Sequence, residues 1–133
     1  MKVLVIDAQG GGIGRQLVAA IKEQLPDAAV TAVGTNAAAT AAMLKAGADR
    51  AATGENAVAV NSRQADVIVG PIGIVIADAL FGEITPRMAL AVAQSPAKRL
   101  LIPVNHCGNI VVGIHNLNIG GLIQDVLHEL QKS

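Results

Sequence analysis

The chain has 133 residues, the usual size of one domain, and 52% are hydrophobic against 15% charged, so we expect a single domain over residues 1–133 with a buried core. Ten Lys and Arg residues balance ten Asp and Glu residues, and Phe81 is the single aromatic residue, which argues against a nucleic-acid partner. A single Cys argues against disulfides and Cys-cluster zinc sites, and the lack of a signal-like start or a long apolar span predicts a cytoplasmic protein that does not contact membranes.

The first half of the chain alternates strand-like and helix-like segments. Residues 2–6 form a short apolar run rich in Val and Ile, which is typical of a parallel strand covered on both faces. After a glycine-rich turn, apolar residues recur at helical spacing until Pro26 ends the helix. The next expected segments are a strand at 29–33, a turn at 34–36, an Ala-rich helix at 37–46 closed by Gly47, a short strand at 50–53, and a helix at 55–64 that could also be a continued strand.

The second half continues the alternation. Thr85 and Pro86 supply a hydroxyl N-cap and a proline at the first helical position, so they mark the start of a helix that runs to Gln94. The other expected segments are a strand at 65–70, an apolar segment at 72–80 expected to be a buried or interfacial helix, a strand at 99–104, a candidate sixth strand at 110–114, and an amphipathic helix starting near Asn116 or Asn118.

This alternation predicts an α/β fold, namely a three-layer Rossmann-like domain with a mostly parallel sheet of five or six strands. In such sheets, ligands bind outside the carboxyl ends of the strands, where the strand order reverses. That rule selects five loops, which are residues 7–14, 34–36, 53–56, 70–73 and 105–109.

The first of these loops is the most informative segment in the sequence. Glycines between a strand and a helix let the backbone approach a ligand, while the helix N-terminus favours an anion such as phosphate. The strict Gly-x-Gly-x-x-Gly spacing is broken by Gln9, and the Gly-x-x-x-Gly-x-Gly form of short-chain dehydrogenases is broken by Ala8. A tight turn that binds no ligand is the alternative. The residues expected to contact phosphate are Gly10, Gly11, Gly12, Ile13 and Gly14.

The sequence leaves the choice of nucleotide open. Dinucleotide sites carry an acid after the second strand for the ribose of NAD, or a nearby Arg for NADP, whereas this chain has Thr35 and Asn36 there. These two side chains could bind a sugar or base, or could form a turn and a helix cap. We expect Gly70, Pro71 and Asn105 to complete the pocket. The chain has no Tyr for short-chain dehydrogenase chemistry and no Walker lysine after the glycines.

Four residues are candidates for catalysis. His106 could act as an acid or base and Cys107 as a nucleophile, because both follow the fifth expected strand. Asp7 would repel a phosphate unless it held a metal, a sugar hydroxyl or the loop amides, and Glu83 could reach the same edge or be a solvated acid. The three His residues are dispersed, so we expect no metal site.

Several motifs together resemble an uncharacterised bacterial family, the domain of unknown function 3842, over almost the whole chain. They are Asp7-Ala8-Gln9-Gly10-Gly11-Gly12-Ile13-Gly14, Gly34-Thr35-Asn36, Ala52-Thr53-Gly54-Glu55-Asn56, Gly70-Pro71-Ile72-Gly73-Ile74, Gly82-Glu83-Ile84-Thr85-Pro86 and Ile102-Pro103-Val104-Asn105. The family pattern has Gly where this chain has Ala8, and the Ala side chain slightly narrows the first turn. The resemblance implies a free-standing bacterial cytoplasmic protein and supplies no activity.

The sequence therefore favours a protein that binds a nucleotide, NAD(P) among the candidates, or another phosphorylated small molecule at the glycine-rich loop. One alternative is an enzyme that acts on a small metabolite with His106, Cys107 or Glu83. The other is an interaction protein without a ligand. In each case, the small apolar chain predicts a homo-oligomer.

Overall fold

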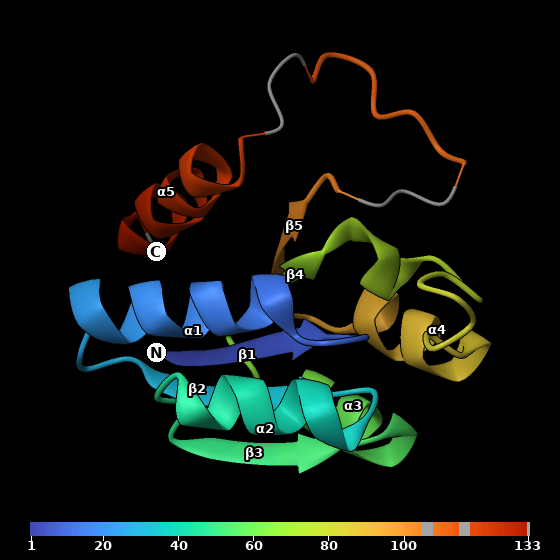
Figure 1. Cartoon of the computed structure of the whole chain (residues 1–133), viewed down its shortest axis with the longest axis horizontal. Helices are drawn as coiled ribbons and strands as arrows, with labels where there is room; N and C mark the ends of the chain where they lie inside the picture. Colours follow the sequence, from blue (N-terminus) through green and yellow to red (C-terminus); the bar gives the residue numbers. More distant parts are fainter. Residues whose placement is uncertain (105–107, 115–117, 133) are drawn as a thin grey trace.

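The structure is a computed structural model that describes residues 1–104, 108–114 and 118–132. Strands and helices alternate along the chain as the sequence predicts (Figure 1). In chain order the elements are β1 (Lys2–Asp7), α1 (Gly12–Gln24), β2 (Ala29–Gly34), α2 (Ala37–Lys45), β3 (Arg50–Thr53), α3 (Glu55–Ser62), β4 (Val67–Pro71), the 3-10 helix η1 (Ile72–Val75), α4 (Pro86–Gln94), β5 (Lys98–Ile102) and α5 (Ile119–Gln131).

The five strands form one parallel sheet in the order β3-β2-β1-β4-β5. β1 is central and pairs with β2 on one side and β4 on the other, so Val3 lies between Val30 and Val67. The strand order reverses between β1 and β4, because β2 and β3 extend to one side of β1, and β4 and β5 extend to the other. The fold is therefore Rossmann-like, and its switch point lies at the carboxyl ends of β1 and β4.

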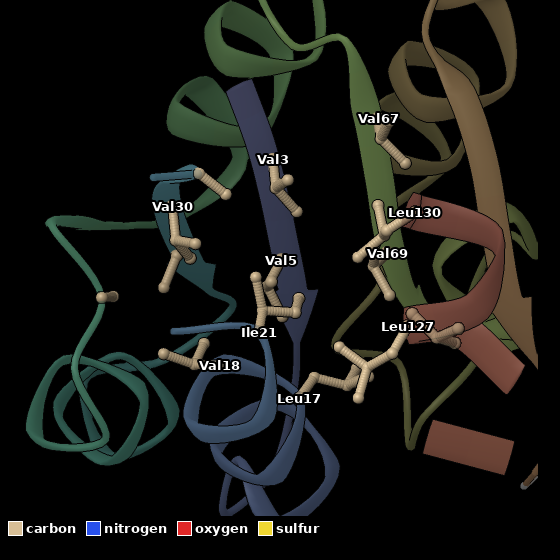
Figure 2. Close-up of a cluster of buried hydrophobic side chains, with 14 of the residues drawn as sticks. Val3, Val5, Leu17, Val18, Ile21, Val30, Val67, Val69, Leu127 and Leu130 are labelled. Carbon is tan, nitrogen blue, oxygen red and sulfur yellow. The ribbon is translucent and has the colours of Figure 1, made fainter. Parts of the chain in front are cut away.

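Alternation of side chains along β1 divides the core between the two faces of the sheet. Val3 and Val5 point to the face covered by α1 and α5, whose Leu17 and Leu127 pack against the sheet (Figure 2). Leu4 and Ile6 point to the opposite face, which is covered by α3, α4 and η1. Both faces of β1 are thus dry, which explains its continuous apolar sequence.

Several helices begin where the sequence predicts. Asn36 caps α2 by accepting a hydrogen bond from the Ala39 amide, and Thr85 caps α4 in the same way through the Met88 amide. Of the two asparagines expected near the start of α5, Asn118 caps the helix, and Asn116 lies outside the described residues. Strand bounds differ from the expectation by up to two residues, as in β4 and β5.

The expected sixth strand at 110–114 is wrong. These residues form no strand, and Ile110 and Val112 are 87% and 92% exposed. Figure 1 shows this segment lying away from the sheet. Gly108 and Gly113 have φ angles of 84° and 94°, and these conformations interrupt an extended run despite its apolar pattern.

The helix expected at 72–80 is also corrected. Helical structure ends at Val75, and Asp78 and Leu80 adopt left-handed φ angles of 66° and 57°, which a right-handed helix excludes. Burial of the segment is confirmed for Ile74, Ala79 and Leu80. None of the helices within the described ranges has the length and apolarity required to cross a bilayer.

Candidate functional site

The glycine-rich loop lines a cavity at the switch point of the sheet. The loop joins the end of β1 to the start of α1, and Pro71 at the end of β4 forms the opposite wall. The cavity has a volume of about 170 Å³. Its lining consists of Asp7, Ala8, Gln9, Gly10, Gly12, Ile13, Pro71 and Leu80. The structure thus brings together five residues proposed from sequence, namely Asp7, Gly10, Gly12, Ile13 and Pro71.

The carboxylate of Asp7 holds the glycine-rich loop through hydrogen bonds to two of its backbone amides. Its Oδ1 accepts a hydrogen bond of 2.8 Å from the Ala8 amide, and its Oδ2 accepts one of 2.6 Å from the Gly14 amide. The side chain is buried, and this burial raises the pKa of Asp7, as does the charge of Glu83 to a smaller extent, while the backbone amides of Gly14, Ala8 and Ile13 act in the opposite direction. Of the roles considered for Asp7, the bonds in this structure match the one in which it holds the loop amides.

These bonds divide the loop amides into two groups. Asp7 takes the amides of Ala8 and Gly14, and the Gly11 amide donates to the Ala8 carbonyl over 3.0 Å. The hydrogen bonds within the described ranges assign no acceptor to the amides of Gly10 and Gly12. Both glycines line the cavity, and nothing lies within 4 Å of where a Cβ would stand on either of them.

The other glycines of the predicted site are required by packing. Gly11 has a φ of 71°, and an added Cβ would lie 2.9 Å from the Ala39 carbonyl oxygen of α2. A Cβ on Gly14 would lie 2.5 Å from Met43 Sδ and 2.8 Å from Asp7 Cβ. At Gly70 a Cβ would collide with the Ile6 carbonyl oxygen of the neighbouring strand. These three residues let α1, α2 and the central strands approach closely, and none of them lines the cavity.

A second polar cluster lies beside the loop, at the end of β2. Glu83 Oε1 accepts hydrogen bonds from the Gln9 amide at 2.8 Å, Thr35 Oγ1 at 2.6 Å and Asn36 Nδ2 at 2.8 Å. These donors, the Thr35 hydroxyl first among them, lower the pKa of Glu83. Thr35 and Asn36, proposed for a sugar or base, therefore hold a carboxylate in this structure, and Asn36 also caps α2.

Gln9 links the loop to this cluster. Its amide donates to Glu83, and its carbonyl oxygen accepts a hydrogen bond of 2.9 Å from Asn36 Nδ2. Gln9 has a left-handed φ of 54°, which costs on the order of 1 kcal/mol for a residue other than glycine. Bonds on both sides of the residue hold it in this conformation.

The sequence offered this edge as one of two positions for Glu83, but it did not predict the hydrogen bonds to Gln9, Thr35 and Asn36. The residue follows η1 in a loop, and α4 begins three residues later at Pro86. Figure 1 shows this loop at the same end of the molecule as the tip of β1. One signal in the sequence could have indicated this position. Glu83 lies just before the Thr85-Pro86 helix start, in the segment that leaves the carboxyl end of β4. The other chemical candidates, Asn105, His106 and Cys107, lie outside the described residues.

Other hollows lie away from this edge. One of about 240 Å³ lies at the amino ends of β1 and β2, near Lys2 and Arg50, and one of about 360 Å³ lies between α3 and α4. No glycine is among the residues that line either of them. Within the part of the chain that the structure describes, no group of three or more His, Cys, Asp or Glu side chains could hold a metal ion.

A family model for a domain of unknown function (DUF3842) matches residues 2–133. The chain belongs to this family. Among solved structures, the chain is similar to a dodecameric FMN-dependent UbiX-like decarboxylase from Escherichia coli O157:H7, at 15% sequence identity and a TM-score of 0.47. The match covers 98% of this chain and 95% of that one. No curated protein matches the chain.

Proposed function

We propose that the chain binds a nucleotide or another phosphorylated small molecule, with a phosphate on the amides of Gly10 and Gly12. The observation that carries the proposal is the cavity between the glycine-rich loop and Pro71 at the switch point. The 13-residue helix α1 begins at Gly12, so the positive end of its dipole lies at this cavity. Ligands of parallel α/β sheets bind at this place in the fold.

The size of the cavity supports a phosphate rather than a whole ligand. Pockets that enclose a small organic ligand are about 300–1,000 Å³, and this one is about 170 Å³. A phosphate group fits inside, and the remainder of a nucleotide would lie along the sheet edge. NAD(P) and other nucleotides are therefore the cofactor candidates.

Calorimetric titration of the full chain tests the proposal. NAD(H), NADP(H), ATP, AMP, coenzyme A and inorganic pyrophosphate are titrated separately, and we expect micromolar binding of at least one. A Gly12→Val variant places its side chain in the cavity and should weaken that binding at least ~10-fold, because access to the amides is lost. Gly121→Val in α5 is the matched control and should bind as the original chain does. Absence of binding by every compound, or unchanged affinity in Gly12→Val, would contradict the proposal.

A role in self-association is supported by a different observation. Phe81, Ile110 and Val112 are 97%, 87% and 92% exposed. Apolar side chains exposed to this degree favour contact with another protein surface. We infer that the chain forms a homo-oligomer, in which these residues are covered. Sedimentation equilibrium should show a species larger than one chain, and the double variant Ile110→Ser, Val112→Ser should shift it toward the monomer. A monomeric original chain would contradict the inference.

A further inference from the structure

Glu83 is a carboxylate held in a defined place by residues far away in the sequence. Its three donors come from the glycine-rich loop, at Gln9, and from the end of β2, at Thr35 and Asn36. All three bonds converge on Oε1. Glu83 is half-buried, and its Oε1 is held by three donors, whereas the hydrogen bonds within the described ranges give its Oε2 none.

The end of the second strand, where Glu83 is held, is the ribose-binding position in Rossmann-like folds. When a phosphate lies at the N-terminus of the first helix, the ribose of the nucleotide reaches the end of the second strand, where an acid accepts hydrogen bonds from its hydroxyls. The sequence after β2 supplies Thr35 and Asn36 and no acid. In this structure the acid at that position comes instead from the segment between η1 and α4.

We propose that Glu83 Oε2 accepts a hydrogen bond from the ribose 2′-hydroxyl of the bound ligand, so that the site selects ribonucleotides in which this hydroxyl is free. This inference rests on the proposed function, because the phosphate on Gly10 and Gly12 places the ribose. A 2′-deoxyribose leaves the carboxylate without this partner. A 2′-phosphate brings two negative charges beside it and should be rejected more strongly.

The surrounding charges support selection of this kind. Thr35 and Asn36 are neutral donors that keep Glu83 ionised at neutral pH. The ion pairs in the described part of the chain involve Lys22, Arg87, Lys98 and Lys132, and none of these includes Glu83. Among the described residues, no ion pair neutralises the negative charge that would meet a 2′-substituent.

The test compares AMP, 2′-deoxy-AMP and adenosine 2′,5′-bisphosphate by calorimetry on the full chain. We expect AMP to bind at least ~10-fold more tightly than either analogue, the order of magnitude for one hydrogen bond to a charged group. Glu83→Gln retains an oxygen for the three donors and removes the charge, and should bring the three affinities to within about threefold of one another. Glu55→Gln removes a charge at the same sheet edge, where Glu55 pairs with Arg87, and should keep the original preference.

The outcomes separate the two proposals. Equal binding of AMP and 2′-deoxy-AMP by the original chain overturns the role of Glu83 and leaves phosphate binding in place. An unchanged preference in Glu83→Gln overturns it as well. Failure of AMP and both analogues to bind overturns the role of Glu83 as stated, and the proposed function is wrong only if NAD(H), NADP(H), ATP, coenzyme A and inorganic pyrophosphate also fail to bind.

Discussion

Gly12 and Gly14 are two residues apart in the same loop, yet a methyl group meets different surroundings at each. A Cβ on Gly14 lies within 3.0 Å of Met43 Sδ and of Asp7, whereas a Cβ on Gly12 has nothing within 4 Å. We expect Gly14→Ala to lower the free energy of unfolding by about 1–3 kcal/mol through overpacking. Gly12→Ala should change it by less than about 0.5 kcal/mol. Urea unfolding measures both, and equal costs would show that the loop is not packed as described.

Glu83 makes stability depend on pH in a direction that the structure fixes. Its pKa is lowered, first by Thr35 and then by Gln9 and Asn36, so the folded state favours the ionised form. The stabilisation is therefore complete above the usual pKa near 4.5, and is lost as the pH falls through the lower folded value. Glu83→Gln should therefore lower the free energy of unfolding more at pH 7 than at a pH below the folded pKa of Glu83. Urea unfolding at both pH values checks this, and a cost that grows on acidification would contradict it.

Asp7 has the opposite dependence. Burial raises its pKa, so the folded state binds the proton more tightly than the unfolded chain does, and stability declines as the pH rises through the folded value. The Glu83 charge is one of the causes that raise the pKa of Asp7, so the Asp7 contribution cancels only in part when the original chain is compared with Glu83→Gln. The two acids flanking the loop thus differ because one is enclosed by the core and the other receives three donors at the surface.

At the scale of the elements, the ends of α3 and α4 provide a matched pair of serines. Ser95 Oγ donates to the Ser62 carbonyl at 2.6 Å and accepts from the Ala97 amide at 3.0 Å. Ser62 Oγ is buried and has no hydrogen-bond partner among the described residues. Ser95→Ala should destabilise by about 1–2 kcal/mol, whereas Ser62→Ala should be neutral or stabilising by up to about 1 kcal/mol. Urea unfolding of both variants decides, and a large loss in Ser62→Ala would reveal an unrecognised partner.

Element types followed from the sequence where capping residues and apolar period agreed. Thr85 and Pro86 marked α4, and the pair Asn116 and Asn118 marked the start of α5, because Thr and Asn side chains accept hydrogen bonds from the free amides of a helix start. The apolar pattern at 110–114 did not indicate whether a neighbouring strand was present to pair with this segment. The left-handed conformation of Gly113 also interrupts the extended backbone that a strand needs. The segment at 72–80 was apolar because part of it is buried, and left-handed residues such as Asp78 set its course instead of a helix.

For the whole molecule, the alternation of strands and helices was enough to place the candidate site at the carboxyl edge near β1. The alternation did not predict which side chains from distant segments meet at the site. Glu83 lies 48 positions from Thr35 and 74 from Gln9, and its position depends on how the segment after η1 returns across the sheet edge. No local pattern encodes that return. The packing of Leu80 and Ile84 into the core fixes it, since both are buried on either side of Glu83.

The place of α5 in the molecule can be tested directly. This helix follows the segment from 103 to 118, yet Leu127 and Leu130 complete the core with Leu17 of α1 and Val69 of β4 (Figure 2). If residues 1–133 form one cooperative domain, as we propose, Leu127→Ala removes buried surface from the only folding unit. It should then lower the free energy of unfolding by about 2–5 kcal/mol without changing the dependence on urea.

Leu90→Ala is the control, because Leu90 is 54% exposed against 2% for Leu127, and it should cost less than about 1 kcal/mol. The measurement follows urea unfolding by circular dichroism and by hydrogen exchange of amides in β1. Loss of protection in β1 that matches the global loss means that α5 and the sheet unfold together. An early transition confined to α5, with β1 protection unchanged, would instead make α5 a separate unit docked on a sheet that is stable without it.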